Sequence, residues 1–444
     1  MKKQVNIIAL IVSVALAILF TFGTTFVIMA NVDKARRAEL AKEYEEQLKE
    51  LEETIEGLGE EGLGVFSSIA QLYNAIPKED QSPELYYKLA MIDYYYRKLY
   101  ANEIDEDKLI YSVLNGYIQG AEDKYGEYYT ADDYKTLVGE NQGNSVGIGV
   151  YVNYSIEYDA IKILSVMENS PAYKAGIKSG DIVTHIDGES VSELGYYIAL
   201  DKVKGDEGTQ VELTILRNSE KITVKATRAK FETKTIYYHQ YEFDKTIGVV
   251  RIVDFNNAMP QQFKNAIEDL TGKGVKSLVF DLRNNPGGTL DSVIEILDYL
   301  LPEGVLAHVT DADGKVLEVH KSDADYLKGI DSMAVLINEN TASAAELFSC
   351  ALKDYEVATL VGVKTYGKGS MQTVFMLPDG TGLRITTNKY NPPKTENYDG
   401  VGIKPDIEVE LSDALNNKSQ FEYTDAEDNQ LKEACDAIKN NKQN

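Results

Sequence analysis

The chain has few of the residues that mark a metal-binding or disulfide-linked protein. Cysteine occurs twice, at Cys350 and Cys435, without a CxxC pair, and the four histidines are scattered without an HExxH motif. Both features argue against a zinc site, and the first argues against a disulfide framework. Basic residues number 45 against 71 acidic ones, which gives a formal charge of -26. Because no basic stripe is visible, the sequence lacks the pattern typical of a nucleic-acid binder.

The N-terminus carries one long apolar run. Residues 7–30 are 24 residues without a charge, preceded by Lys2 and Lys3. A membrane-spanning helix needs roughly 20 residues, whereas the core of a cleaved signal peptide has about 7–15. An uncleaved anchor is therefore favoured over a cleaved signal. The two lysines favour an N-terminus inside the cell, although basic residues at 34–37 favour the opposite orientation. We expect residues 1–31 to form a cytoplasmic stub and transmembrane anchor, with the catalytic domain extracytoplasmic.

Residues 32–138 are predicted to form a helical N-terminal region. Between 33 and 58, apolar residues recur every three or four positions, a pattern typical of a short coiled coil that pairs two chains. A helix packed on its own domain would give the same stripe. A second helical stretch is expected over roughly 66–138.

From residue 145 to 230 the pattern changes to short strands with turn signals. Asp187-Gly188 predicts a hairpin turn, and a helix is expected over about 193–203. From about 246 strands and helices alternate, which predicts an α/β core with a largely parallel sheet over 231–410. Sites in such sheets form where the carboxyl ends of strands enter loops. The sequences RNNPGG (283–288) and NENTAS (338–343) are two such loops. The remainder, 411–444, is a C-terminal tail that ends in a predicted helix.

Ser343 stands at the start of a predicted helix, among the small residues of NENTASAAE. With Glu346 it forms the capping-box pattern, so a purely structural role explains it well. The same position also suits a nucleophile, because the free N–H groups and the positive dipole end of a helix favour a developing oxyanion. The motif alone leaves both roles open.

A nucleophilic serine needs a base. The chain has no GxSxG elbow and no SxxK pair, and no histidine lies in an evident site loop. A lysine that burial keeps neutral is the remaining option. Lys368 lies between Gly367 and Gly369, which allow the backbone to turn tightly before an apolar strand. Gln372, four residues on, could orient the amine without adding charge. A solvated loop lysine is the alternative interpretation.

Several segments in the same order resemble the C-terminal processing peptidases, also called tail-specific proteases. NENTASAAE is followed by GKGSMQ, with the lysine 25 residues after the serine. FDLRNNPGG resembles the strand and loop before the catalytic serine of that family. ENSPAYKAGIKSGDIVTHIDGESV resembles part of its PDZ domain, DEDKLIYSVLNGYIQGAEDKYGEYY its helical segment, and DNQLKEACDAIK its final helix. The resemblance covers about residues 85–440.

The resemblance implies a fold and a mechanism. The core would have the sheet-and-helix architecture of ClpP and crotonase, with an inserted PDZ domain at 145–230. Ser343 would attack the scissile carbonyl, Lys368 would accept its proton, and Gln372 would position Lys368. The backbone N–H groups of Ala344 and Gly288 would hold the oxyanion. The alternative for the Gly288 loop is an ordinary tight turn.

A PDZ domain binds a free C-terminal end as an added strand. The residues expected to hold its carboxylate are Gly147, Ile148, Gly149 and Val150. The missing third glycine and the absence of a following helix argue against a dinucleotide-binding loop there. Lys204 stands where relatives often have an arginine, and a lysine lacks the planar fork of a guanidinium. Details of activation could therefore differ in this chain.

The sequence thus predicts a membrane-anchored serine endopeptidase that recognises C-terminal tails. No metal and no organic cofactor is implied. The expected partners are proteins or peptides with exposed C-termini and the membrane, with a homodimer as an option and no nucleic acid. Two rivals stay open: a catalytically silent PDZ scaffold on a protease fold, and an esterase that uses the same serine.

Overall fold

The computed structural model describes residues 82–441 except 156, 168, 416 and 417. The chain divides into two compact units, 1–110 and 111–444. Within the described part, the first unit contains helix α4 (Pro83–Leu99) and the beginning of α5 (Glu106–Gly120). No helix in the described part is long and apolar enough to cross a membrane. The predicted anchor and the predicted coiled coil both lie outside the described residues.

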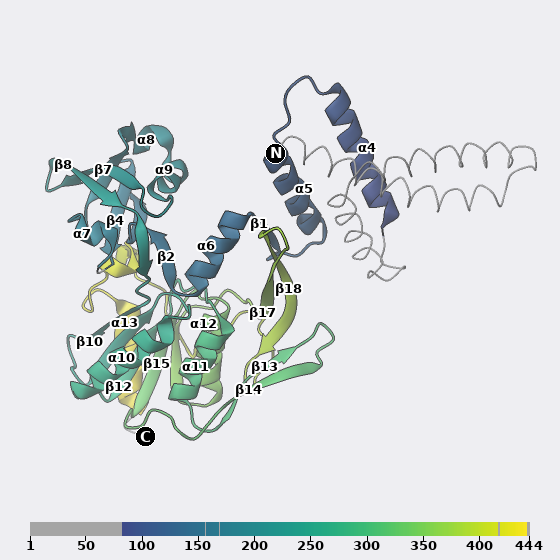
Figure 1. Ribbon diagram of the computed structural model, residues 1–444. Coiled ribbons are helices and arrows are strands. Elements are labelled where there is room, and N and C mark those ends of the chain that lie inside the picture. The colour runs from purple at the N-terminus through teal and green to yellow at the C-terminus, as the bar shows by residue number, and fades with distance from the viewer. Residues whose placement is uncertain (1–81, 156, 168, 416–417, 442–444) are drawn as a thin grey trace, which may run out of the picture. The chain divides into compact units, whose positions relative to one another are not determined.

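The core of the second unit is a six-stranded sheet covered by helices on both faces (Figure 1). In spatial order its strands are β10 (Ile236–Gln240), β11 (Ile247–Ile252), β12 (Ser277–Asp281), β15 (Ser332–Ile337), β16 (Ala358–Gly362) and β19 (Ile407–Glu408). All neighbours pair in parallel except β10, which pairs antiparallel with β11. The predicted α/β core with a largely parallel sheet is confirmed.

Alternating strand residues form two apolar layers. One layer packs against α10 (Met259–Gly272), α11 (Leu290–Leu300) and α12 (Ala344–Asp354). The other packs against α13 (Asn429–Asn441), the helix predicted for the tail. Strands buried on both faces read as continuous apolar runs, which explains why they were visible in the sequence.

A second, antiparallel sheet was not predicted. Its strands are β1 (Glu127–Tyr129), β18 (Gly382–Asn391), β13 (Gly304–Thr310) and β14 (Val316–Ser322), with β17 (Ser370–Met376) also paired to β18. The prediction that 66–138 is helical is therefore wrong at 127–129. This strand forms by pairing with residues 382–384. It has only three residues, which are too few to show a strand pattern in the sequence.

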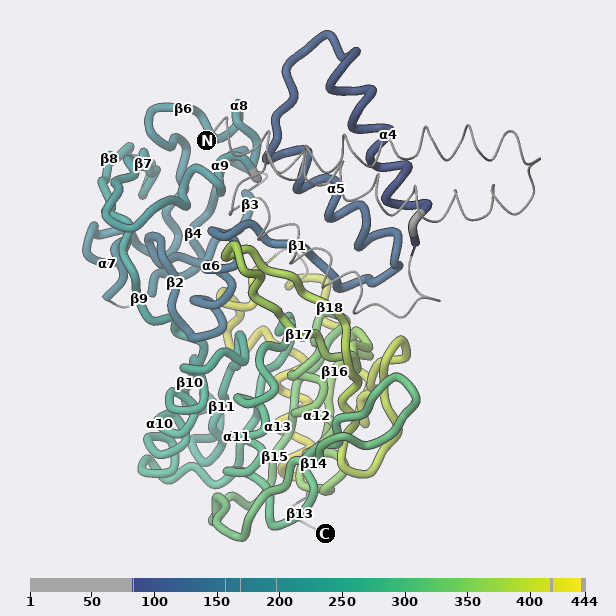
Figure 2. The backbone as a smooth tube through the Cα atoms, turned by 45° about the vertical axis from the view of Figure 1, so that its right-hand side comes forward, coloured from purple at the N-terminus to yellow at the C-terminus, as the bar shows by residue number. Residues whose placement is uncertain are grey.

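The β-rich module has a sheet of its own and lies between β1 and β10 in sequence (Figure 2). It contains a sheet of five strands, β3 (Val150–Ser155), β4 (Ala160–Val166), β5 (Ile182–Ile186), β7 (Gln210–Arg217) and β8 (Glu220–Thr227), to which β6 (Glu189–Ser190) is added. Strands β2 (Asn144–Gly147) and β9 (Ala229–Glu232) pair and connect it to the core. Its helices are α7 (Pro171–Lys174), α8 (Val191–Leu194) and α9 (Tyr196–Val203). The predicted hairpin turn at Asp187-Gly188 joins β5 to β6 and is confirmed.

Candidate active site

One cavity of about 350 Å³ brings together five predicted site residues. Ser343 and Ala344 come from the beginning of α12, and Gly288 from the loop after β12. Lys368 comes from the loop before β17, and Gln372 from that strand. The predicted carboxylate loop at 147–150 lies in the β-rich module and does not line this cavity.

Ser343 lies on a sharp turn between β15 and α12. Its backbone has φ 58° and ψ -123°, a region that residues with a side chain rarely adopt. Such strain is concentrated at functional sites, where the surrounding structure holds it in place. Ala344, the first residue of the helix that follows, lines the cavity, and the first N–H groups of a helix have no partner within the helix itself.

Glu346 connects the serine turn to the lysine loop. One carboxylate oxygen accepts the backbone N–H groups of Ser343, at 2.9 Å, and of Lys368, at 2.8 Å. The other accepts the Gly367 N–H at 2.7 Å and the Thr365 hydroxyl at 2.6 Å. Burial raises the pKa of Glu346, and these four hydrogen bonds oppose the rise. The capping-box pattern predicted the contact between Glu346 and Ser343. It did not predict the contact between Glu346 and the loop that carries Lys368.

The loop after β12 places two glycines against the serine turn. A Cβ on Gly287 would lie 2.6 Å from the Ser343 Cβ, so this close approach requires glycine. Phe255 donates its N–H to the Gly287 carbonyl and accepts the Thr289 N–H. Since these groups point toward Phe255, the N–H of Gly288 between them points the other way, and Gly288 lines the cavity. This geometry is suitable for an oxyanion donor.

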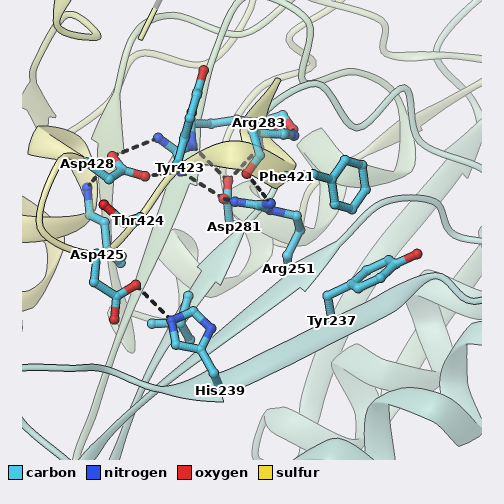
Figure 3. Close-up of a pocket in the computed structure, with 13 residues that line it drawn as sticks. Tyr237, His239, Arg251, Asp281, Arg283, Phe421, Tyr423, Thr424, Asp425 and Asp428 are labelled. Atoms are coloured by element: carbon cyan, nitrogen blue, oxygen red, sulfur yellow. Dashed lines mark hydrogen bonds and ion pairs between the residues drawn. The ribbon is translucent and has the colours of Figure 1, made fainter. Parts of the chain in front are cut away.

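A buried ion network fixes the first residue of the same loop (Figure 3). Arg283 forms ion pairs with Asp281 and Asp428, and the three side chains are only 4%, 1% and 2% exposed. Arg251 also pairs with Asp281. Burial alone would raise the pKa of Asp281, but the two guanidinium groups lower it well below its usual range. These residues border a second cavity of about 230 Å³.

The C-terminal tail closes this network. The Gln420 side chain donates to the Arg283 carbonyl at 2.6 Å and accepts from Asn284 at 3.3 Å. Asp428 and Gln430 both accept hydrogen bonds from the Arg283 guanidinium. The tail therefore helps to hold the loop that carries Gly288.

Lys368 is partly buried, and its amine lies 4.4 Å from the centre of the Tyr125 ring. Burial and the nearby Arg384 guanidinium lower the pKa of Lys368. The Gln372 amide donates to Ser370 at 3.2 Å and to Thr386 at 3.3 Å. Within the described part of the chain, no hydrogen bond joins Gln372 to the lysine amine.

Tyr390 occupies the position next to the serine hydroxyl. Its phenol oxygen lies 2.7 Å from the Lys368 carbonyl and 3.0 Å from Ser343 Oγ. Because the carbonyl can only accept, it takes the phenol proton, and the Ser343 hydroxyl can then donate to the phenol oxygen. No hydrogen bond between Ser343 and the Lys368 amine is present among the described residues. The Ser343 hydroxyl thus contacts Tyr390, and the Lys368 amine contacts Tyr125.

Sequence reasoning missed both tyrosines. Tyr125 belongs to DKYGEYY, a segment noted only for its resemblance to the peptidase family, and Tyr390 ends an ordinary strand pattern. No local signal links either residue to the site.

The predicted carboxylate loop has the backbone expected of a tight turn. Gly149 has φ 77°, and a Cβ there would lie 2.3 Å from the Ser170 Cβ, so only glycine fits. The Ile148 carbonyl accepts the Ala172 N–H, which fixes the loop against α7. Strand β3 follows directly and is an edge strand of the sheet in the β-rich module.

Two family models match this chain. The model described as peptidase family S41 matches residues 246–409, which include the serine, the lysine and the RNNPGG loop. The model described as PDZ domain matches residues 162–217. The loop at 147–150 lies before that matched stretch.

Curated relatives match this chain over most of its length. The "Probable CtpA-like serine protease" of Staphylococcus aureus (strain COL) is 35% identical over 348 residues, covering 77% of this chain and 68% of that protein. The protein of the same name from Staphylococcus haemolyticus is 33% identical over 357 residues, with 78% and 68% covered. A solved S41 protease from Bacteroides fragilis is 19% identical, covers 72% of this chain and 87% of that one, and has a TM-score of 0.50. This last likeness concerns the fold alone.

Proposed function

The chain belongs to peptidase family S41 and is a serine-type peptidase with a PDZ domain, and we propose that it is a membrane-anchored endopeptidase that recognises exposed C-terminal tails of proteins. Ser343 is the nucleophile, Lys368 the general base and Gln372 a residue that positions the lysine. The observation that supports these roles most directly is the single cavity lined by all three side chains, Ala344 and Gly288.

Catalysis begins when Lys368, without its proton, accepts the proton of the Ser343 hydroxyl. The serine oxygen attacks the scissile carbonyl carbon, and the carbonyl oxygen becomes an oxyanion held by the N–H groups of Ala344 and Gly288. The protonated lysine then donates to the leaving amine, and water hydrolyses the acyl-enzyme by the same steps. A lysine normally titrates near pH 10.4, so the burial that lowers its pKa makes it an effective base closer to neutral pH.

The resting contacts suggest what substrate binding must change. The serine hydroxyl lies beside Tyr390, and the lysine amine lies on Tyr125. Proton transfer requires the two groups to come within hydrogen-bond distance. Substrate binding supplies this rearrangement, and Gln372 is close enough in sequence and on the same cavity wall to guide the amine.

Recognition of the tail is assigned to the PDZ domain. A peptide would pair with β3 and place its carboxylate at Gly147 to Val150, while α9 borders the groove. Tyr154 of β3 and Tyr196 of α9 meet edge to face, with ring centres 5.6 Å apart. These rings give the groove an aromatic wall suited to an apolar tail residue.

The membrane anchor is a separate part of the proposal. It is supported by the uncharged run at 7–30, and it places the catalytic domain outside the cytoplasm. Removal of residues 1–31 should release the protein from the membrane fraction after alkaline washing. Recovery of the truncated and full chains in the same fraction would contradict the anchor, and digestion by protease added to intact cells tests the orientation.

The central test is cleavage of an unfolded model protein with an apolar C-terminus. The full chain in detergent, Ser343→Ala and Lys368→Ala are compared, and the loss in kcat expected for each variant is at least about 10³-fold, because each removes a reacting group. Lys353→Met, a surface change outside the cavity, is the control. Binding without cleavage by the wild type would favour the silent scaffold, and hydrolysis of small esters alone would favour the esterase.

A further inference from the structure

The segment 123–129 contacts the base side of the candidate active site through Lys368 and β18, although it is more than 200 residues from Ser343 in sequence. Strand β1 pairs with β18, and the Asp123 carboxylate accepts the backbone N–H and the hydroxyl of Thr386 at 2.8 and 2.7 Å. Arg384 donates to the Tyr125 carbonyl at 2.8 Å. Four separate contacts thus fix the backbone on both sides of Tyr125.

Tyr125 presents the face of its ring to the lysine. The Lys368 amine lies 4.4 Å from the ring centre, within the approximately 6 Å at which a cation is attracted to an aromatic ring. Both side chains are partly buried. The amine makes no hydrogen bond or ion pair within the described part of the chain, so the interaction with this ring is the one that holds it there.

We propose that Tyr125 is a positioning residue: its ring binds the protonated amine of Lys368 in the resting enzyme, and the amine leaves the ring when it loses its proton and becomes the base. This inference rests on the proposed role of Lys368. A neutral amine gains little from the ring, since the attraction acts on the charge. Loss of the proton therefore frees the amine to turn toward Ser343.

The other charged and titratable groups near the amine shift the pKa of Lys368, some upward and some downward. They come from the segment before β1, from β18, and from the loops on either side: Lys124, Arg384, Tyr366 and Asp399. Burial, Arg384 and Lys124 lower the pKa of Lys368, while Tyr366 and Asp399 raise it. The ring of Tyr125 adds a preference for the protonated form to this balance.

The ring's charge distribution can be tested with almost no change in shape. Phenylalanine keeps an electron-rich ring face, and pentafluorophenylalanine reverses its charge while filling similar space. The full chain is prepared as Tyr125→Phe and with pentafluorophenylalanine at the same position. We expect the acid limb of kcat/KM against pH to match for wild type and Tyr125→Phe. With the fluorinated ring it should move to lower pH by about 0.4–1.5 units, because the protonated amine loses its support.

A ring that only fills space would leave the acid limb of the fluorinated protein in place, and a limb that is unchanged or moved to higher pH overturns the proposal. Tyr125→Leu gives a second comparison if incorporation of the fluorinated residue is incomplete. This variant should also move the acid limb of kcat/KM to lower pH, because it removes the ring but keeps an apolar side chain. A circular dichroism melt of each protein identifies any variant that has lost its fold.

The titration of Lys368 can also be measured without turnover. Lysine labelled with ¹³C at Cε gives a pH-dependent NMR signal, which the Lys368→Met spectrum assigns. The fluorinated ring should lower this midpoint whether or not the protein cleaves peptides. An unchanged midpoint contradicts the role of Tyr125. If the fluorinated ring lowers the midpoint but the wild type cleaves nothing, the role of Tyr125 stands and the proposed function is contradicted instead.

Discussion

The two halves of the candidate site are held in different ways. The nucleophile half, Ser343 with the loop 283–288, lies on the parallel sheet and is supported by buried ion pairs and backbone hydrogen bonds. The base half, Lys368 with Gln372, lies beside the antiparallel sheet and is completed by a distant segment. Its lysine amine rests on an aromatic ring, without a hydrogen bond in the described part of the chain.

This difference indicates which half is able to change. Breaking a buried, fully paired charge network is costly, so the nucleophile half is pre-organised. A cation on a ring is held far more weakly. We therefore expect substrate binding to adjust the base half, with Glu346 keeping the two backbones in register. Perturbing each half separately, from the most severe change to the mildest, can break or sharpen this comparison.

The largest effect is expected from Arg283→Met in the nucleophile half. It leaves Asp281 and Asp428 buried without their guanidinium partner, which should cost about 3–5 kcal/mol of unfolding free energy. Urea denaturation measures this loss. Lys264→Met removes a pair in which the side chains are 31% and 54% exposed, and should cost less than about 1 kcal/mol. Equal losses would show that the network is no more important than a surface pair.

Gly287→Ala should mainly reduce the rate. The new Cβ would lie 2.6 Å from the Ser343 Cβ and 2.8 Å from the Ala342 carbonyl oxygen, at φ 106°. Displacing the serine from the proposed oxyanion donors should lower kcat by about 10²–10³-fold. Gly314→Ala has a similarly positive φ of 82° but nothing within 4 Å, so its kcat should be unchanged. A normal kcat for Gly287→Ala would mean that the nucleophile half can shift to accommodate the added methyl group.

Asp254, next to the Phe255 that holds the Gly287 backbone, makes the stability of the fold sensitive to pH. Burial raises the pKa of Asp254 to about 6, so the folded state favours the neutral carboxyl. Stability is then complete below the unfolded pKa, near 4, and falls as pH rises through about 6. Asp254→Asn should be more stable than wild type by about 2–3 kcal/mol at pH 8. Near pH 4 the two should be equal, and a difference that persists there would point to packing in place of charge.

The smallest effect is expected from Lys124→Met in the base half. Lys124 is exposed, and its charge lowers the pKa of Lys368. Its removal should move the acid limb of kcat/KM to higher pH by about 0.1–0.4 unit, and high salt should abolish the shift. This direction is opposite to that expected when the Tyr125 ring is fluorinated. Lys315→Met, on the turn between β13 and β14, should leave the limb unchanged, and a shift there would indicate a general charge effect.

The parallel sheet and its helices could be predicted because each element carries its own pattern of buried residues. Ser343 and Lys368 could be proposed because their flanking motifs resemble those of a known family. The antiparallel sheet could not, since β1 has three residues and exists only through its pairing with β18. Tyr390 lies 47 residues from Ser343 in sequence, and only the tertiary fold brings them together. The same applies to Tyr125 and Lys368.

The placement of Asp428 has a consequence for the time at which activity arises during synthesis. Domains generally begin to fold from the N-terminal end as the chain is made, but Arg283 must wait for Asp428 and Gln430, which lie 145 and 147 residues further along the chain. Strand β1 likewise waits for β18 before it can pair and hold Tyr125 beside Lys368. A growing chain that already contains Ser343 therefore still lacks the partners that fix the loop 283–288. We expect no proteolytic activity from a chain that has not yet reached Asp428 and Gln430.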